Sequence, residues 1–80
     1  MQYGAVDYNT LVDTAVHFIK KRVKAYPTVK SVKRTDICAV LFDRYGFFTK
    51  NLTNGMMQDI ARRVLGEYKV STGGRSRIVF

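Results

Sequence analysis

Residues 53–66 read TNGMMQDIARRVLG, and the apolar side chains of this stretch recur with the period of an α-helix. The positions i, i+3, i+4, i+7 and i+8 are occupied by Met57, Ile60, Ala61, Val64 and Leu65. This spacing places them on one stripe, which we expect to face the core. Thr53 or Asn54 can cap the start of the helix, and Gly66 offers a C-terminal stop. The sequence therefore predicts a helix over residues 53–65.

The opposite face of this helix is polar and basic. It carries Asn54, Gln58, Asp59, Arg62 and Arg63. Side chains of these types can reach base edges and phosphates when a helix lies in a groove of DNA. An ordinary surface helix with a solvated basic edge shows the same pattern. Asp59 stands at helical spacing from Arg62 and Arg63, so we expect it to pair with one of them.

Residues 68–80 predict a β-hairpin that follows this helix. Gly73-Gly74 forms the turn, because both glycines accept positive φ angles. With the two-residue period of a strand, one face points toward the core and contains Tyr68, Val70, Ile78 and Phe80. Lys69, Arg75 and Arg77 point the other way, and Val79 breaks the alternation.

The first helix is expected over residues 8–25, since Pro27 disfavours helical geometry in the residue before it. Its core stripe contains Leu11, Ala15, Phe18, Ile19 and Val23. Val12 and Val16 widen the apolar face beyond what one small core must cover, so this helix could also form the contact of a homodimer. A long helix packed across both others explains the width equally well.

A second helix is expected over residues 35–45, with Thr35 as its N-cap and Gly46 as a left-handed C-cap. Phe47 and Phe48 follow directly, and we expect both rings to fold back into the core. Residues 26–34 connect the first two helices as a loop or a stub of strand, in which Val29 and Val32 contact the core. The fold class is thus mainly α with a small β-hairpin.

The chain has 80 residues, which suffices for one domain over 1–80 and is too short for two cores. No apolar run approaches the ~18 residues of a membrane span, and the start does not resemble a secretory signal. We expect no membrane partner and a location inside the cell: in the cytoplasm, on the nucleoid or in a host cell's cytoplasm. Cys38, the single cysteine, cannot form an intrachain disulfide and is expected to be buried.

The net charge of +8 and the pI of about 10 come from two basic zones. Residues 62–77 form one zone. The other has no acidic residue and contains Lys20, Lys21, Arg22, Lys24, Lys30, Lys33 and Arg34. Clustered charge of this kind favours a polyanionic partner, most often DNA or RNA. An anionic membrane surface fits less well, because Pro27 interrupts the basic segment.

Three of these cations precede or begin the second helix. Lys30, Lys33 and Arg34 could hold a DNA backbone together with the N-terminal amides of that helix. A solvated loop that keeps the protein soluble explains them equally well.

Catalysis is not indicated by the sequence. His17 is the only histidine, and no nucleophile or carboxylate stands at a spacing that suggests a catalytic set. One histidine and one cysteine are too few for a tetrahedral zinc site. We therefore expect neither an enzyme nor a metal or other cofactor.

Three helices, with a helix-turn-helix between the second and third and a basic Gly-tipped hairpin behind them, resemble the winged-helix family of DNA-binding domains. The resemblance implies a third helix in the major groove and a wing on the phosphate backbone or in the minor groove. The helix residues that would then contact DNA are Asn54, Gln58, Arg62 and Arg63. The wing residues are Lys69, Arg75 and Arg77.

These expectations describe a double-stranded DNA-binding protein, a regulator of transcription that acts as a homodimer through its first helix. Two other functions stay open. The same fold can serve as a protein-protein interaction module that carries its charge for an acidic partner. RNA binding is the third, although the aromatic strand pattern of single-strand readers is absent.

Overall fold

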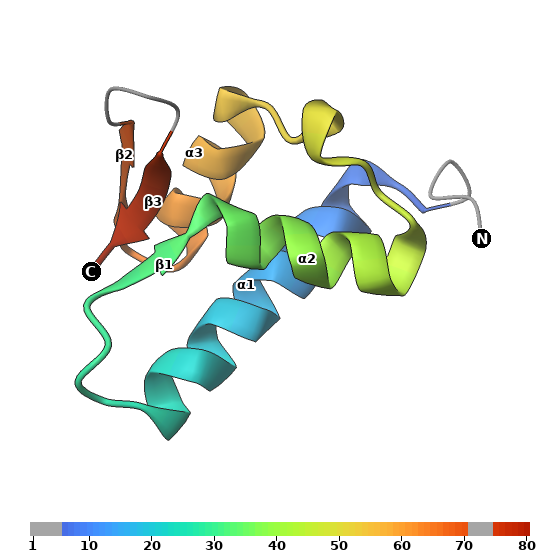
Figure 1. Cartoon of the computed structure of the whole chain (residues 1–80). Helices are drawn as coiled ribbons and strands as arrows, with labels where there is room; N and C mark the ends of the chain where they lie inside the picture. The colour runs from blue at the N-terminus through green and yellow to red at the C-terminus, as the bar shows by residue number, and fades with distance from the viewer. Residues whose placement is uncertain (1–5, 71–74) are drawn as a thin grey trace.

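The computed structural model describes residues 6–70 and 75–80, so the expected Gly73-Gly74 turn lies outside the described residues. Three helices, one short 3₁₀ segment and a three-stranded sheet make up the fold (Figure 1). In chain order the elements are α1 Tyr8–Ala25, β1 Ser31–Lys33, α2 Arg34–Tyr45, η2 Thr49–Asn51, α3 Asn54–Arg63, β2 Glu67–Val70 and β3 Ser76–Val79. The protein is thus mostly helical, with an antiparallel sheet.

Helix α1 packs on both other helices and begins at a side-chain cap. The Asp7 carboxylate accepts a hydrogen bond from the Thr10 amide at 2.8 Å, which satisfies one of the free amides of the first turn. The buried face contains Leu11, Val12, Ala15 and Ile19. Val12 is fully buried, and Val16 packs against the core. The wide apolar face therefore serves this one core, and it gives no support to a dimer contact.

Helix α2 begins one residue earlier than expected. Its N-cap is Lys33, which makes no side-chain cap, so the prediction of Thr35 as the cap was wrong. Gly46 ends the helix in the left-handed conformation, with φ at 67°, and its amide donates to the Phe42 carbonyl at 2.8 Å, as predicted. Cys38 is buried on this helix, which confirms the expectation for the single cysteine.

The connection from α2 to α3 buries one of its two phenylalanines. Phe47 enters the core, as expected, but Phe48 is 53% exposed and its ring lies 6.2 Å from that of Phe42, centroid to centroid. The expectation for Phe48 was therefore wrong. The 3₁₀ turn that follows brings Leu52 into the core and turns the ring of Phe48 toward solvent.

Helix α3 starts as the sequence predicted and ends earlier. The Thr53 hydroxyl accepts from the Met56 amide at 3.2 Å, so Thr53 is the cap. The chain leaves the helix at Val64, and Leu65 adopts a φ of 58° with 93% of its surface exposed. Because Leu65 no longer lies on a helix, its predicted place in the apolar stripe was wrong. Met56 is buried in addition to the predicted residues.

The sheet has the strand order β1-β3-β2, with both pairs antiparallel. Side chains at one register level point inward: Val32 and Ile78 are buried, and Tyr68 is half-buried between them and α3. Val70 is 63% exposed and Phe80 is 40% exposed, so the prediction that they face the core was wrong. Val70 is the last residue of β2, and Phe80 follows the last residue of β3.

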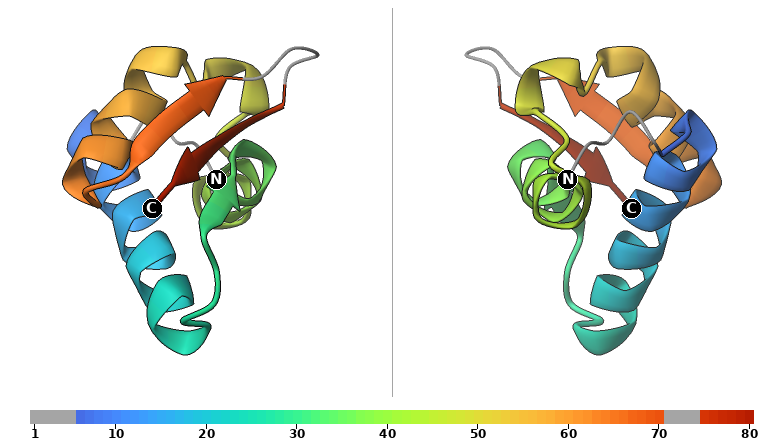
Figure 2. Two further views of the ribbon diagram at one scale, coloured as in Figure 1. Left: turned by 90° about the vertical axis from the view of Figure 1, so that its left-hand side faces the viewer. Right: turned by 90° about the vertical axis from the view of Figure 1, so that its right-hand side faces the viewer.

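The helices cover one face of the sheet and leave the other face open (Figure 2). The core between the layers contains Leu11, Val12, Ala15, Ile19, Val32, Ile37, Cys38, Leu41, Phe47, Leu52, Met56, Met57, Ile60, Ala61 and Ile78. Strands β1 and β3 are anchored in this core by Val32 and Ile78, and the side chains that alternate with these two residues lie on the open face.

Candidate nucleic-acid interface

A row of three cations crosses the open face of the sheet. In the strand register Lys33 of β1 is the partner of Arg77 on β3, and Arg77 is in turn the partner of Lys69 on β2. Directly paired residues share one face of a sheet, and all three side chains are exposed. The central strand thus carries an arginine with a lysine on each side.

This row is not neutralised within the part of the chain that the structure describes. No ion pair or hydrogen bond joins Lys33, Lys69 or Arg77 to a carboxylate among residues 6–70 and 75–80. Like charges directly opposite one another destabilise a sheet. An arrangement that costs stability in the free protein is favourable when an anion lies across the three strands.

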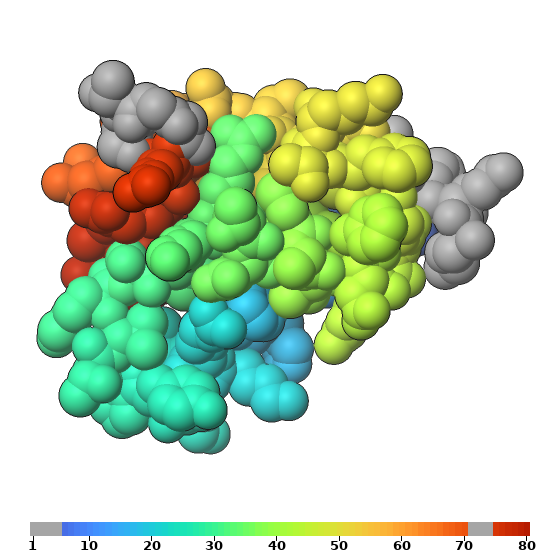
Figure 3. Space-filling view, viewed as in Figure 1, coloured from blue at the N-terminus to red at the C-terminus, as the bar shows by residue number. Residues whose placement is uncertain are grey.

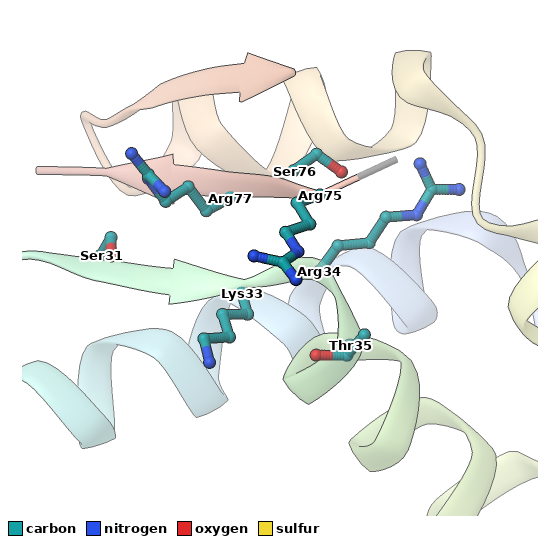
Figure 4. Close-up of a pocket in the computed structure, with 7 residues that line it drawn as sticks. All are labelled: Ser31, Lys33, Arg34, Thr35, Arg75, Ser76 and Arg77. Carbon is teal, nitrogen blue, oxygen red and sulfur yellow. The ribbon is translucent and has the colours of Figure 1, made fainter. Parts of the chain in front are cut away.

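A pocket of about 540 Å³ adjoins the row at the start of α2 (Figure 4). Its lining combines cations with hydroxyl groups: Ser31, Lys33, Arg34, Thr35, Arg75, Ser76 and Arg77. Arg75, the residue before β3, reaches toward the β1–α2 junction, and Arg77 lies on β3 itself. The hairpin residues expected on a wing and the lysine expected on a DNA backbone therefore lie on one surface.

Arg34 behaves differently from the other cations of the pocket. Its guanidinium points away from Lys33 and Arg75 (Figure 4) and donates to the Leu52 carbonyl. Two longer hydrogen bonds run to the Asn54 side-chain oxygen at 3.3 Å and to the Tyr68 hydroxyl at 3.4 Å. Arg34 thus ties the start of α2 to the turn before α3 and to β2, so we assign it a structural role.

Replacement of Arg34 by alanine is expected to lower the free energy of unfolding by about 1–3 kcal/mol, since it leaves a part-buried carbonyl unsatisfied and removes bonds to a charged donor. The neighbouring Lys33→Ala is the matched control and should leave that free energy unchanged or raise it by up to about 1 kcal/mol, because it removes the repulsion between Lys33 and Arg77. Urea denaturation followed by circular dichroism measures both. Equal stability of the two variants would contradict the structural role of Arg34.

The arginines expected on a DNA-reading face of α3 are held by carboxylates. Arg62 donates to Asp59 within the helix, and Arg63 pairs with Asp13 of α1 at 2.8 Å. Asp59 was expected to pair with an arginine on α3, and it does so with Arg62. The partner of Arg63 lies fifty residues away in the chain and was not foreseen.

Asp59 also accepts a hydrogen bond from the hydroxyl of Tyr8 on α1. This hydrogen bond, followed by the nearby arginines Arg62 and Arg63, lowers the pKa of the Asp59 carboxyl from its ordinary value. Burial, followed by the bond to Asp59, raises the pKa of the Tyr8 hydroxyl. Asp59 therefore stays ionised and Tyr8 stays protonated at neutral pH, so the tie between α1 and α3 is kept.

The two remaining candidates on α3, Asn54 and Gln58, differ in their contacts with the rest of the fold. The Asn54 side-chain oxygen accepts from the Tyr68 hydroxyl at 2.8 Å and from Arg34, so it is committed to the fold. Gln58 is exposed in the middle of the helix.

Lys30 is exposed in the connection before β1, where its carbonyl accepts from the Phe80 amide at 3.0 Å.

Strand β1 is the element that assembles this surface, and sequence reasoning left it as a loop or a stub of strand. The only signal is Val32, an apolar residue between polar neighbours, and three residues are too few for a period to appear. No local pattern indicates that β1 pairs with residues 77–79, so the contact between Lys33 and Arg77 was missed.

Comparison of the chain with protein-family models, with curated proteins and with solved structures finds no match. Among residues 6–70 and 75–80, no helix has the length and apolar character needed to cross a bilayer. The same residues contain no group of three or more His, Cys, Asp or Glu side chains placed to hold a metal ion.

Proposed function

We propose that this protein binds double-stranded DNA and regulates transcription, and that the open face of the sheet is its main phosphate-binding surface. The observation that carries the proposal is the row Lys33, Arg77 and Lys69, which crosses all three strands and makes no ion pair with a carboxylate among residues 6–70 and 75–80. A duplex has two closely spaced lines of phosphates, and cations held at fixed strand spacing can neutralise several of them at once.

The order of the elements supports a winged-helix assignment of this fold. One strand lies between α1 and α2, and the two others follow α3 and pair so that the last strand is central. In that arrangement α3 is the helix that would enter the major groove. Gln58 is then the best candidate for reading a base edge, because its amide can bridge adenine N6 and N7.

The charge pattern supports a division of labour between helix and sheet. Asp59 and Asp13 compensate part of the charge of Arg62 and Arg63. Lys33, Arg77 and Lys69 have no such ion pair among the residues that the structure describes. Phosphate contacts fix register and supply affinity without reading sequence. We therefore propose a protein whose affinity comes mainly from the sheet, with a smaller sequence-specific part from α3.

A titration of the protein with a 20-base-pair duplex, with single-stranded DNA and with RNA, followed by fluorescence anisotropy at several salt concentrations, tests the proposal. For the duplex, a plot of log K against log salt should have a slope of about −3 or steeper, because each phosphate contact contributes roughly −0.9. The contacts expected are those of Lys33, Lys69, Arg75 and Arg77. The duplex should bind more tightly than either single strand.

Other outcomes would replace the proposal. Tighter binding of single-stranded RNA would place the protein in the RNA-binding class. Failure to bind any nucleic acid at low salt would leave an interaction module with an acidic partner as the remaining function. Light scattering on the free protein determines whether a dimer exists in solution. The burial of Val12 gives no support to a dimer contact through α1.

A further inference from the structure

The C-terminal half of α1 carries a second basic surface, which the proposed function does not use. His17, Lys20, Lys21 and Lys24 stand at i, i+3, i+4 and i+7, so they form one stripe along the helix. All four side chains are exposed. The opposite side of the helix contains the buried Ala15 and Ile19, so the stripe faces away from the core.

The helix dipole explains only part of this stripe. Cations are favoured near a helix C-terminus, but the effect falls off within the last turn, which here contains Arg22 and Lys24. Lys20 and Lys21 lie farther from the end. Lysines at i and i+4, such as Lys20 and Lys24, repel each other and destabilise a helix.

Two carboxylates near the stripe already have partners, and a third, Asp43 of α2, lines a pocket together with His17 and Lys21. Asp36 of α2 accepts from Arg22 at 2.8 Å, and the Arg22 guanidinium also lies over the Phe18 ring, 4.9 Å from its centroid. Asp13, one turn before His17, pairs with Arg63. No ion pair joins Lys20, Lys21 or Lys24 to an acidic residue among those that the structure describes.

A connection without acidic residues joins the stripe to the sheet. From Lys20 to Lys33 the chain has no acidic residue, and the exposed Lys30 lies between the end of α1 and β1. In the space-filling view the surface of residues 24–30 adjoins that of residues 31–34, which in turn adjoins β3 (Figure 3). Basic residues are therefore present on the sheet, on the connection and on α1, with no acidic residue between Lys20 and Lys33.

We infer that the duplex held on the sheet runs on over this connection, and that Lys20, Lys21 and Lys24 contact its phosphates. The inference rests on the proposed function and extends the phosphate-binding surface from the sheet over the connection to α1. We call this extended surface the track. The longest dimension of the protein is 34 Å, so the track can follow about ten base pairs at 3.4 Å each. A shorter duplex can be held by the sheet alone.

The test compares two double variants that lose the same charge. Lys20→Gln/Lys24→Gln removes two cations from the stripe, and glutamine keeps a helix propensity close to that of lysine. Arg44→Gln/Lys50→Gln is the matched control, because both residues are exposed in the last turn of α2 and in η2, elements that belong neither to α1 nor to the sheet. Arg44 lines a pocket with His17 and Lys21, but Lys20 and Lys24 do not line it. Each protein is titrated with a 20-base-pair duplex and with a hairpin that has a six-base-pair stem.

The stripe variant should bind the long duplex about tenfold more weakly than the control at low salt, with a salt slope smaller by about 1.8 for two lost contacts. On the short hairpin the two variants should bind alike. Equal binding of both variants to the long duplex would overturn the track and leave DNA binding by the sheet intact. Failure of the unaltered protein to bind either DNA would overturn the proposed function as well.

Discussion

Reversal of one charge, Arg77→Glu, is expected to weaken binding to double-stranded DNA by at least about a hundredfold at low salt and to stabilise the free protein. Arg77 lies between Lys33 and Lys69, so a glutamate there removes the central cation and pairs with both lysines. The row then changes from three positive charges to a net charge of one. Several phosphate contacts are weakened together, and the salt slope should fall by about two or more.

The expected gain in stability has the same origin. Two repulsive cross-strand pairs become attractive, and each such pair contributes roughly 0.2–1 kcal/mol. Urea denaturation should therefore show an increase of about 0.4–2 kcal/mol in the free energy of unfolding. A loss of binding that accompanies a gain in stability cannot be caused by misfolding.

Lys50→Glu is the matched control for this substitution, because it makes the same charge change at an exposed position in η2. It should weaken DNA binding only through the net charge of the protein and should leave stability nearly unchanged. The assignment of the sheet as the main phosphate-binding surface is wrong if Arg77→Glu and Lys50→Glu bind DNA equally well.

The helical part of the fold could be predicted from sequence because its signals are local. The i, i+3, i+4 spacing identified the buried face of α3, and the Gly46 stop followed from the conformational freedom of glycine. Leu65 was misplaced because the same spacing continues beyond the point where the chain leaves the helix. Its positive φ angle lies just before Gly66, which packs against the sheet. A tertiary contact of this kind leaves no periodic signal in the sequence.

The candidate site could be predicted as a list of residues but not as an arrangement. The alternation in the hairpin correctly put Lys69 and Arg77 on the outer face, opposite the buried Ile78. The pairing of Arg77 with Lys33 joins residues that are 44 positions apart, and the ion pair of Arg63 with Asp13 spans fifty. Contacts at such separations depend on the tertiary fold. They place Lys33 beside Arg77 on the open face of the sheet and pair Arg63 of α3 with Asp13 of α1.

Gly66→Ala is expected to destabilise the folded protein, because Gly66 is where the turn from α3 to β2 touches the central strand. A Cβ at this position would lie 2.9 Å from the Ile78 Cγ2 atom and 2.9 Å from the Val79 carbonyl oxygen. The first contact is with a fully buried side chain and the second with the backbone, so neither atom can move aside easily. The amide of Gly66 also donates to the Ala61 carbonyl at 2.8 Å, which fixes its position from the helix side.

Overpacking of this kind costs about 1–3 kcal/mol, which lowers the melting temperature of a domain of this size by roughly 4–20 °C. Gly55→Ala is the control, because a Cβ there meets only the Thr53 hydroxyl oxygen at 3.9 Å. Alanine is favoured over glycine within a helix by up to about 1 kcal/mol, so this variant should melt at the same temperature or higher. Thermal unfolding of both variants separates a steric effect at Gly66 from a general effect of replacing glycine. If the two variants have the same melting temperature, the close approach of the α3–β2 turn to β3 is not a feature of the folded protein. The contact of Gly66 with Ile78 and Val79 would then no longer support the register that aligns Arg77 with its two lysines.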